Sequence, residues 1–198
     1  MKRSDEKPED KNIVWHGGKI TYEDRVKNLG QEGRVIWLTG LSGSGKSTIA
    51  VEVERELLKE GQAVYRLDGD NIRHGLNSDL GFSAEDRDEN IRRIAEVAAL
   101  FKDAGLIVLA SFISPYQKMR DFARQRAQGK FIEIYVKADV ETCASRDPKG
   151  LYEKAKRGEI ENFTGVSAPY EEPKDPELVI DTAQLSVEES VQKVLDYI

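Results

Sequence analysis

The stretch that decides the fold is Gly40-Leu41-Ser42-Gly43-Ser44-Gly45-Lys46-Ser47, which fits the pattern G-x-x-x-x-G-K-[ST]. It follows an apolar run from Val35 to Thr39 and precedes a helical pattern with Ile49, Val53 and Leu57 on one face. In that context the backbone N–H groups of a glycine-rich loop turn inward around phosphate oxygens, and the helix N-terminus adds partial positive charge. A plain connecting turn is the weaker interpretation, because both the context and the Gly-Lys-Ser ending are present. The stretch predicts a nucleoside triphosphate site.

Two residues of this loop carry the expected phosphate chemistry. We expect Lys46 to reach the β- and γ-phosphates and the Ser47 hydroxyl to bind Mg²⁺. A GTPase would carry Asn or Thr, then Lys, any residue and Asp to read guanine. The nearest segment here is Val136-Lys137-Ala138-Asp139, and valine cannot form that hydrogen bond. Large mechanical ATPases need more chain than 198 residues, so a small-molecule kinase is the leading class.

Outward from the loop, strand-sized apolar runs alternate with helical patterns. We expect the longest helix at residues 87–103, where apolar residues recur at helical spacing. The expected strands are 35–39, 63–67, 106–110, 131–136 and 178–180. This alternation implies parallel strands joined by right-handed crossovers. The predicted fold class is therefore α/β, a three-layer αβα sandwich with a mostly parallel sheet, of the P-loop NTPase type.

Two stretches fall outside this alternation. Residues 1–12 are dominated by charges, so we expect a disordered polar tail ahead of a single domain at 13–198. From Asp147 to Pro176 the sequence has glycines, prolines and charges with little periodicity. A connection of that length in a compact domain usually forms a lid or a binding loop.

Composition limits the partners of the protein. The 30 basic and 36 acidic residues give a net charge of −6, which argues against a nucleic-acid coat or an anionic-membrane binder. The single cysteine, Cys143, excludes an internal disulfide, and with only His16 and His74 beside it a zinc site is not expected. The apolar runs are too short to cross a bilayer. We expect a soluble cytoplasmic protein without nucleic-acid polymer or membrane partners.

Asp68 and Asp70 follow the second expected strand, at the edge where ligands bind in open α/β sheets. We expect this pair one strand away from the phosphate loop. One carboxylate can accept the proton of an acceptor hydroxyl, and the other can organise Mg²⁺ through water. The alternative is a plain turn, since Asp68-Gly69-Asp70-Asn71 is rich in turn-forming residues. We favour catalysis because such sites form at the ends of buried strands.

Four arginines follow this turn: Arg73, Arg87, Arg92 and Arg93. In a net acidic chain, cations that face a phosphate loop indicate an anionic acceptor. Arg87 and Asn90 share one helix face, whereas Arg92 and Arg93 fit a solvated helix face equally well. Phe82 is either a core residue or a ring that stacks on a base.

Beyond the loop, the sequence resembles the adenylyl-sulfate kinases, the enzymes of sulfate activation, over nearly the whole expected domain. The resemblance rests on these blocks: Ile13 to His16, Gly40 to Thr48, Leu67 to Leu76, Asp79 to Ser83, Glu89 to Arg93, Phe112 to Tyr116, Arg146 to Tyr152 and Asn162 to Gly165. It implies transfer of the γ-phosphoryl group of ATP to the 3′-hydroxyl of adenosine 5′-phosphosulfate. The products would be 3′-phosphoadenosine 5′-phosphosulfate and ADP.

The resemblance also implies roles for individual residues. ATP would be held by the loop from Gly40 to Thr48 and by Arg146, with Mg²⁺ on Ser47 and Asp70. The catalytic groups would be Lys46, Asp68, Asp70 and Ser114, with Asp68 as base or acceptor positioner. The acceptor would be bound by Asp68, Arg73, Phe82, Arg87, Asn90, Ile113, Ser114, Lys154 and Phe163, with the two phenylalanine rings on either side of its adenine. Residues 147–165 resemble the family's lid.

Two interpretations of Ser114 remain open. In bacterial members of the family a serine at this place is described as a phosphoserine intermediate, whereas Ser114 before Pro115 also suits a helix cap. We favour capping with acceptor positioning, because direct in-line transfer needs no protein nucleophile. Gln117 and Ala144 depart from the Arg and Glu that many relatives carry there, which affects one basic contact and the orientation of Arg146.

The resemblance further implies a homodimer and a functional link to an ATP sulfurylase. Two rival functions share the loop. One is a kinase for another small acceptor, such as a nucleoside, nucleotide or sugar acid. The other is an ATP-dependent regulatory module without turnover, which the catalytic carboxylates expected at Asp68 and Asp70 disfavour.

Overall fold

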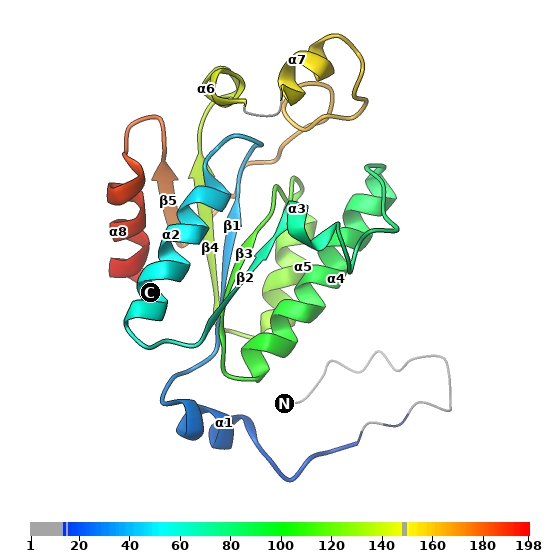
Figure 1. Ribbon diagram of the computed structural model, residues 1–198. Helices are drawn as coiled ribbons and strands as arrows, with labels where there is room; N and C mark the ends of the chain where they lie inside the picture. The colour runs from blue at the N-terminus through cyan, green and yellow to red at the C-terminus, as the bar shows by residue number, and fades with distance from the viewer. Residues whose placement is uncertain (1–13, 15, 148–149) are drawn as a thin grey trace.

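The computed structural model describes residues 14, 16–147 and 150–198, and its centre is a parallel five-stranded sheet (Figure 1). The strands are β1 (Arg34–Thr39), β2 (Val64–Asp68), β3 (Ile107–Ser111), β4 (Phe131–Lys137) and β5 (Leu178–Asp181). The helices are α1 (Tyr22–Leu29), α2 (Lys46–Lys59), α3 (Gly69–Ile72), α4 (Ala84–Asp103), α5 (Gln117–Ala127), α6 (Val140–Arg146), α7 (Leu151–Lys156) and α8 (Val187–Tyr197). None of these helices is both long and apolar enough to cross a membrane. The expected tail at 1–12 lies outside the described residues, as do residues 148–149 of the expected lid.

Helices cover both faces of the sheet, which confirms the predicted three-layer sandwich (Figure 1). Val35 and Trp37 of β1 pack in a core with α4 and α5, whereas Ile36 and Leu38 pack in a core with α2 and α8. All four side chains are buried. A strand that is buried on both faces needs a continuous apolar run rather than an alternating one, as the sequence of β1 has.

The strand order places the acidic pair farther from the phosphate loop than expected. The sheet runs β2-β3-β1-β4-β5, so β3 lies between β1 and β2. The aspartates at the end of β2 are therefore two strands from the phosphate loop, and the prediction of one strand was wrong. Chain order does not reveal this, because β3 joins the sheet only after the long helix α4.

Helix boundaries follow their caps. Ser83 accepts a hydrogen bond from the backbone of Asp86, so α4 starts at Ala84, three residues earlier than expected. Ser186 and Glu189 form a capping box at the start of α8. The acidic turn is the short helix α3, and helix α1, with its own capping box, was not predicted.

A third, smaller cluster lies above the sheet, where α6 and α7 are drawn in Figure 1. It joins the phosphate loop to α6, α7 and the segment after them, through Leu41, Ala138, Cys143, Tyr152, Ala155 and Phe163. Where it is described, the expected irregular stretch therefore contains one helix, α7, and is packed at its base. Its movement as a lid stays a prediction.

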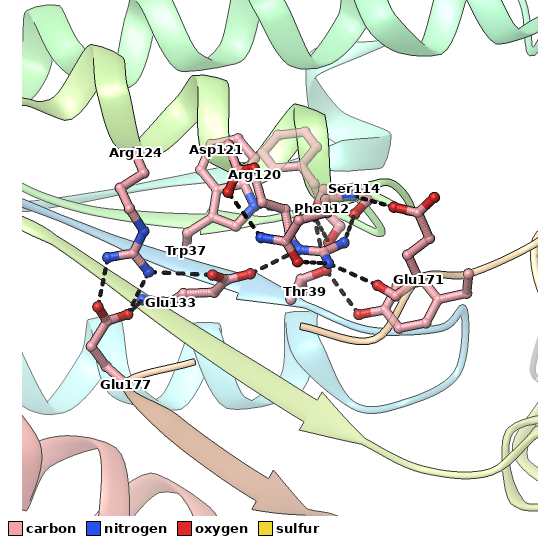
Figure 2. A network of polar contacts seen from close by, with 12 residues as sticks. Trp37, Thr39, Phe112, Ser114, Arg120, Asp121, Arg124, Glu133, Glu171 and Glu177 are labelled. Carbon is pink, nitrogen blue, oxygen red and sulfur yellow. Dashed lines mark hydrogen bonds and ion pairs between the residues drawn. The ribbon is translucent and has the colours of Figure 1, made fainter. Parts of the chain in front are cut away.

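A buried ion-pair network joins α5 to β4 and to the segment before β5 (Figure 2). Arg120 is fully buried, and its Nε lies 2.8 Å from Oε1 of the buried Glu133. Arg124 lies 3.2 Å from the other oxygen of Glu133 and 2.6 Å from Glu177. Burial raises the pKa of Glu133, and the two arginines oppose that rise. Each buried charge in this network is paired, as the low polarity of the interior requires.

We predict that Arg120→Met lowers the free energy of unfolding by about 3–5 kcal/mol, because it leaves the Glu133 charge buried without its closest partner. Urea denaturation measures the loss. Lys118→Ala on the same helix is the control, because Lys118 is 67% exposed in its ion pair with Asp88 and such pairs contribute at most about 1 kcal/mol. Equal losses in the two variants would contradict the prediction.

Candidate active site

The phosphate loop between β1 and α2 has a backbone that only glycine adopts readily. Gly40 and Gly43 have φ values of +150° and +79°. A Cβ atom at Gly40 would lie 2.3 Å from the carbonyl oxygen of Val136, and one at Gly43 would lie 2.8 Å from that of Cys143. The loop is therefore fitted closely between the end of β4 and helix α6.

Lys46 is the first residue of α2, and its side chain is buried inside the curve of the loop. Its Nζ donates to the Leu41 carbonyl at 2.6 Å and lies 3.4 Å from Ser44 Oγ. Burial lowers the pKa of Lys46 to about 8, and the nearby carboxylates of Asp68 and Asp70 partly oppose this. A phosphate oxygen is a stronger partner for an ammonium than a carbonyl. The Lys46 ammonium can therefore exchange its bond to the Leu41 carbonyl for a bond to a nucleotide phosphate.

Ser111 links the phosphate loop to the acidic residues, and sequence reasoning missed it. It ends β3, its Oγ lies 3.3 Å from Ser47 Oγ, and its register partner on β2 is Asp68. Ser47, Ser111 and Asp68 thus follow one another along the carboxyl edge of the sheet. Thr48 is exposed in the first turn of α2. The available signal for Ser111 was a polar residue that closes an apolar strand at this edge.

Asp68 has one engaged and one available carboxylate oxygen. Its Oδ1 accepts a hydrogen bond from the backbone of Asp70 at 3.1 Å and so caps α3. Its Oδ2 is buried without a hydrogen bond from the described residues, 3.5 Å from Nη1 of Arg66. A buried carboxylate oxygen that pairs with one arginine but accepts no hydrogen bond from the described residues has a lone pair with which to take a hydroxyl proton.

The donors at this edge fit a magnesium ion that arrives with a nucleotide. The described residues hold no group of three or more Asp, Glu, His or Cys side chains that could bind a metal by themselves. Mg²⁺ in phosphate sites usually keeps its waters and takes only one or two carboxylates. The exposed Ser47 hydroxyl and the exposed Asp70 on α3 provide such a partial set.

Arg73 and Phe82 form one exposed platform after α3. The Arg73 guanidinium donates to the carbonyls of Leu80 and Gly81 at 2.9 and 3.1 Å and lies 4.3 Å from the centre of the Phe82 ring. Phe82 is 64% exposed, so it is not a core residue. An exposed ring backed by a fixed cation suits stacking on a base.

The other predicted basic residues separate into two groups. Arg87 donates to Oγ1 of Thr164 at 3.0 Å and to the carbonyl of Asn162, so it bridges α4 and the segment after α7. Arg92 and Arg93 pair with Glu89 on their own helix, and Arg93 also pairs with Asp79. These two fit the solvated-face interpretation.

Asn90 is buried beside these arginines, and its Oδ1 accepts a hydrogen bond from Asn77 at 2.9 Å. The remaining predicted contacts lie in the segment above the loop. Phe163 is 9% exposed and packs edge-on against Tyr152 at 5.0 Å, whereas Lys154 on α7 is exposed. The Tyr152 hydroxyl donates to the carbonyl of Ser42 at 2.8 Å. This bond ties the expected lid to the phosphate loop.

Arg146 is linked to the phosphate loop by Thr182, a residue that sequence reasoning missed. Its guanidinium donates to the hydroxyl and the carbonyl of Thr182 at 3.0 and 2.6 Å. The Thr182 hydroxyl in turn donates to the carbonyl of Ser44 at 2.9 Å. The departure at Ala144 leaves a small side chain packed against the third cluster.

Ser114 is not a helix cap, and that prediction was wrong. Helix α5 starts at Gln117 after Tyr116, which makes no side-chain cap. The Ser114 hydroxyl is instead buried, where it accepts from Trp37 Nε1 at 3.0 Å and donates to Thr39 Oγ1 at 2.9 Å (Figure 2). In this buried position the Ser114 hydroxyl makes two hydrogen bonds, whereas a helix-capping hydroxyl would make one, to a backbone N–H.

A cavity of about 610 Å³ lies against Leu41 of the phosphate loop. Leu41, Tyr135, Val140 and residues 165–170 contribute to its lining, and Lys46 and Asp68 do not. The phosphate chemistry is therefore placed by the loop and the aspartates rather than by this cavity.

Comparisons with known proteins show which family this sequence and fold match. Residues 32–181 match the family model described as adenylylsulphate kinase. The chain is 56% identical to an adenylyl-sulfate kinase of Staphylococcus carnosus and 60% identical to one of Geotalea uraniireducens. These alignments cover 94% of this chain and 94% and 90% of the two relatives. An APS kinase of Mycobacterium tuberculosis, solved in complex with AMPPNP and APS, superposes with a TM-score of 0.81 at 49% identity, over 84% of this chain and 98% of that one.

We predict that Ser114→Ala lowers the free energy of unfolding by about 1–3 kcal/mol, because the buried Trp37 N–H loses its acceptor. Thermal and urea denaturation measure the change. Ser145→Ala is the matched control, since the Ser145 hydroxyl is exposed and, among the described residues, bonds only to its own helix. A Ser114→Ala protein as stable as this control would show that the Trp37 bond is not maintained in solution.

We predict that nucleoside triphosphate binding takes up protons near pH 8. Lys46, whose pKa is about 8 in the free protein, is then only partly charged, and bound phosphates raise its pKa. Affinity should therefore fall as the pH rises from about 7 to about 9. Calorimetry in two buffers of different ionisation enthalpy measures the uptake, which Lys46→Arg should abolish. A binding heat that is independent of the buffer in the unaltered protein would contradict the assignment.

Proposed function

The chain belongs to the adenylyl-sulfate kinase family, and from that premise we propose that the residues described above perform the family's reaction. The protein transfers the γ-phosphoryl group of ATP to the 3′-hydroxyl of adenosine 5′-phosphosulfate. The products are 3′-phosphoadenosine 5′-phosphosulfate and ADP. The observation that supports the assignment of residues best is the row of Lys46, Ser47, Ser111 and Asp68 at one edge of the sheet.

The phosphate loop and Lys46 act on the donor. The backbone N–H groups of the loop and the start of α2 bind the phosphates, while Lys46 exchanges the Leu41 carbonyl for the transferring group. In phosphoryl transfer the protein mainly positions the reactants and neutralises charge. Arg146, held by Thr182 beside the loop, lies against the rest of the nucleotide.

Mg²⁺ would be held by Ser47 and Asp70. When bound, the ion neutralises charge on the phosphates. Removal of divalent cations with EDTA should therefore stop turnover, and added Mg²⁺ should restore it.

Asp68 acts on the acceptor. Its available Oδ2 takes the proton of the 3′-hydroxyl as that oxygen attacks, while Oδ1 stays engaged with α3. Arg73, Arg87 and Asn90 bind the phosphosulfate and ribose, and Phe82 stacks on the adenine, with Phe163 on the opposite side. Ile113, Ser114 and Lys154 complete the acceptor contacts. Ser114 positions rather than reacts, because its proton is engaged with Thr39.

An assay of ADP release with ATP, Mg²⁺ and a panel of acceptors tests the function. Turnover with adenosine 5′-phosphosulfate alone supports it. Turnover only with a nucleoside, nucleotide or sugar acid would assign a different small-molecule kinase. No turnover with any acceptor would favour the regulatory module.

We also propose a homodimer, a cytoplasmic location and a functional link to an ATP sulfurylase, on the resemblance to the family. A sulfurylase forms the acceptor that this reaction consumes. Light scattering of the purified chain measures the oligomeric state, and a monomeric mass would refute the dimer.

We predict that Asp68→Asn lowers kcat by about 10²- to 10⁴-fold, because the acceptor proton loses its base. The fold should persist, because asparagine caps a helix as well as aspartate does. Asp181→Asn is the matched control: Asp181 also ends a strand, and its Oδ1 accepts the backbone N–H two residues on at 3.0 Å. An Asp68→Asn enzyme with the kcat of this control would exclude the assigned role.

A further inference from the structure

The hydroxyl groups around Ser114 form a chain whose direction is fixed at both ends. The Trp37 indole N–H can only donate, and its acceptor is Ser114 Oγ. The Ile113 carbonyl can only accept, and its donor is Thr39 Oγ1 at 2.7 Å. Ser114 therefore donates to Thr39 at 2.9 Å, since its other acceptor, the Phe112 carbonyl, is 3.5 Å away. The single hydroxyl hydrogen of Thr39 is already donated to the Ile113 carbonyl. The Tyr170 hydroxyl, 3.0 Å away, must therefore be the donor in its bond with Thr39.

Tyr170 completes the hydrogen bonding of Thr39. The threonine oxygen donates one bond, to Ile113, and accepts two, from Ser114 and Tyr170, which fills its capacity. Burial raises the pKa of Tyr170 to about 12, so its hydroxyl keeps the proton that it donates. Removal of this donor leaves a lone pair of Thr39, a buried residue, without a partner.

Tyr170 belongs to the segment that returns from the expected lid, and this segment is joined to the loop after β3 at three further points. The Glu171 N–H donates to the Pro115 carbonyl at 2.8 Å, and the Glu171 carboxylate accepts from the Gln117 N–H at 2.7 Å. The Arg120 guanidinium donates to the carbonyls of Ser114 and Glu171 at 2.7 and 2.8 Å (Figure 2). The two segments therefore form one hydrogen-bonded joint.

Ser114 also needs external support for its backbone. Its φ is +39°, in the left-handed region that non-glycine residues rarely adopt. Such a conformation persists where the surroundings hold it. Here Arg120 holds the carbonyl of Ser114, and the Trp37–Thr39 chain holds its side chain.

We propose that Tyr170 is a positioning residue for the acceptor: through Thr39, its hydroxyl holds Ile113 and Ser114 in the orientation that the acceptor meets. The inference rests on the proposed function, which assigns Ile113 and Ser114 to the acceptor. It adds that the seating of the lid's return segment sets the geometry of the acceptor side.

The test compares Tyr170→Phe with Tyr135→Phe. Each variant loses one hydroxyl and keeps its ring, and the two rings stack with centroids 6.1 Å apart, but no hydroxyl contact to Thr39 involves Tyr135. Tyr170→Phe should raise the KM for adenosine 5′-phosphosulfate by about 3- to 10-fold, the effect of one lost hydrogen bond. The KM for ATP should not change. Tyr135→Phe should keep both values.

A second pair of variants guards against a folding defect. Thr39→Val removes all three bonds at nearly constant shape and should raise the acceptor KM at least as much as Tyr170→Phe. Thr39→Ser keeps the oxygen and should retain most of the acceptor affinity. Thermal unfolding of each variant identifies general loosening, in which the KM values for both substrates would rise together and the proposal would fail.

A spectroscopic readout is independent of turnover. The chain contains two tryptophans, and a Trp15→Phe variant assigns the indole N–H resonance of Trp37. Tyr170→Phe should shift that resonance and Tyr135→Phe should not, because only Tyr170 reaches Trp37 through Thr39 and Ser114. An unchanged resonance in Tyr170→Phe would overturn the proposed connection.

The outcomes separate the two levels of inference. An unaltered protein that does not phosphorylate adenosine 5′-phosphosulfate would refute the proposed function and the positioning role with it. An active protein in which Tyr170→Phe and Tyr135→Phe have the same acceptor KM would refute the positioning role alone.

Discussion

The phosphate loop keeps its shape because there is no room for a side chain at Gly40 or Gly43, and much of the active site depends on that fit. The loop is confined by the end of β4 on one side and by α6 on the other. This confinement holds Lys46 in a buried position at the start of α2, where its charge is costly without a strong partner. The phosphates of a nucleotide supply that partner. The buried position of Lys46 in the free protein therefore already favours phosphate binding.

The segment above the loop is tied to both halves of the site. Tyr152 bonds to the loop at Ser42, and Arg87 joins α4 to Thr164. Because the same segment contacts donor and acceptor regions, its position is a variable that both ligands share. Linkage then requires that whatever one ligand does to this position is felt by the other with equal strength.

Local sequence signals predicted the fold well where a short stretch determines the outcome. The motif at 40–47 and the apolar strands were both confirmed. Ser114 failed as a cap because Glu171, a residue distant in sequence, fixes the chain around Pro115 both directly and through Arg120. The position of β3 between β1 and β2, and with it the role of Ser111, depends on long-range pairing that no local pattern records.

The attachment of helix α1 has a practical consequence for protein engineering. The Gln31 carboxamide bonds to both backbone groups of Ala63 and to the carbonyl of Gly105, which fastens the chain entering β1 to two connections at the amino ends of the strands. Figure 1 shows α1 at the foot of the sheet, opposite α6 and α7. An affinity tag or fusion partner attached ahead of Tyr22 would therefore join the domain at the far end from the substrates.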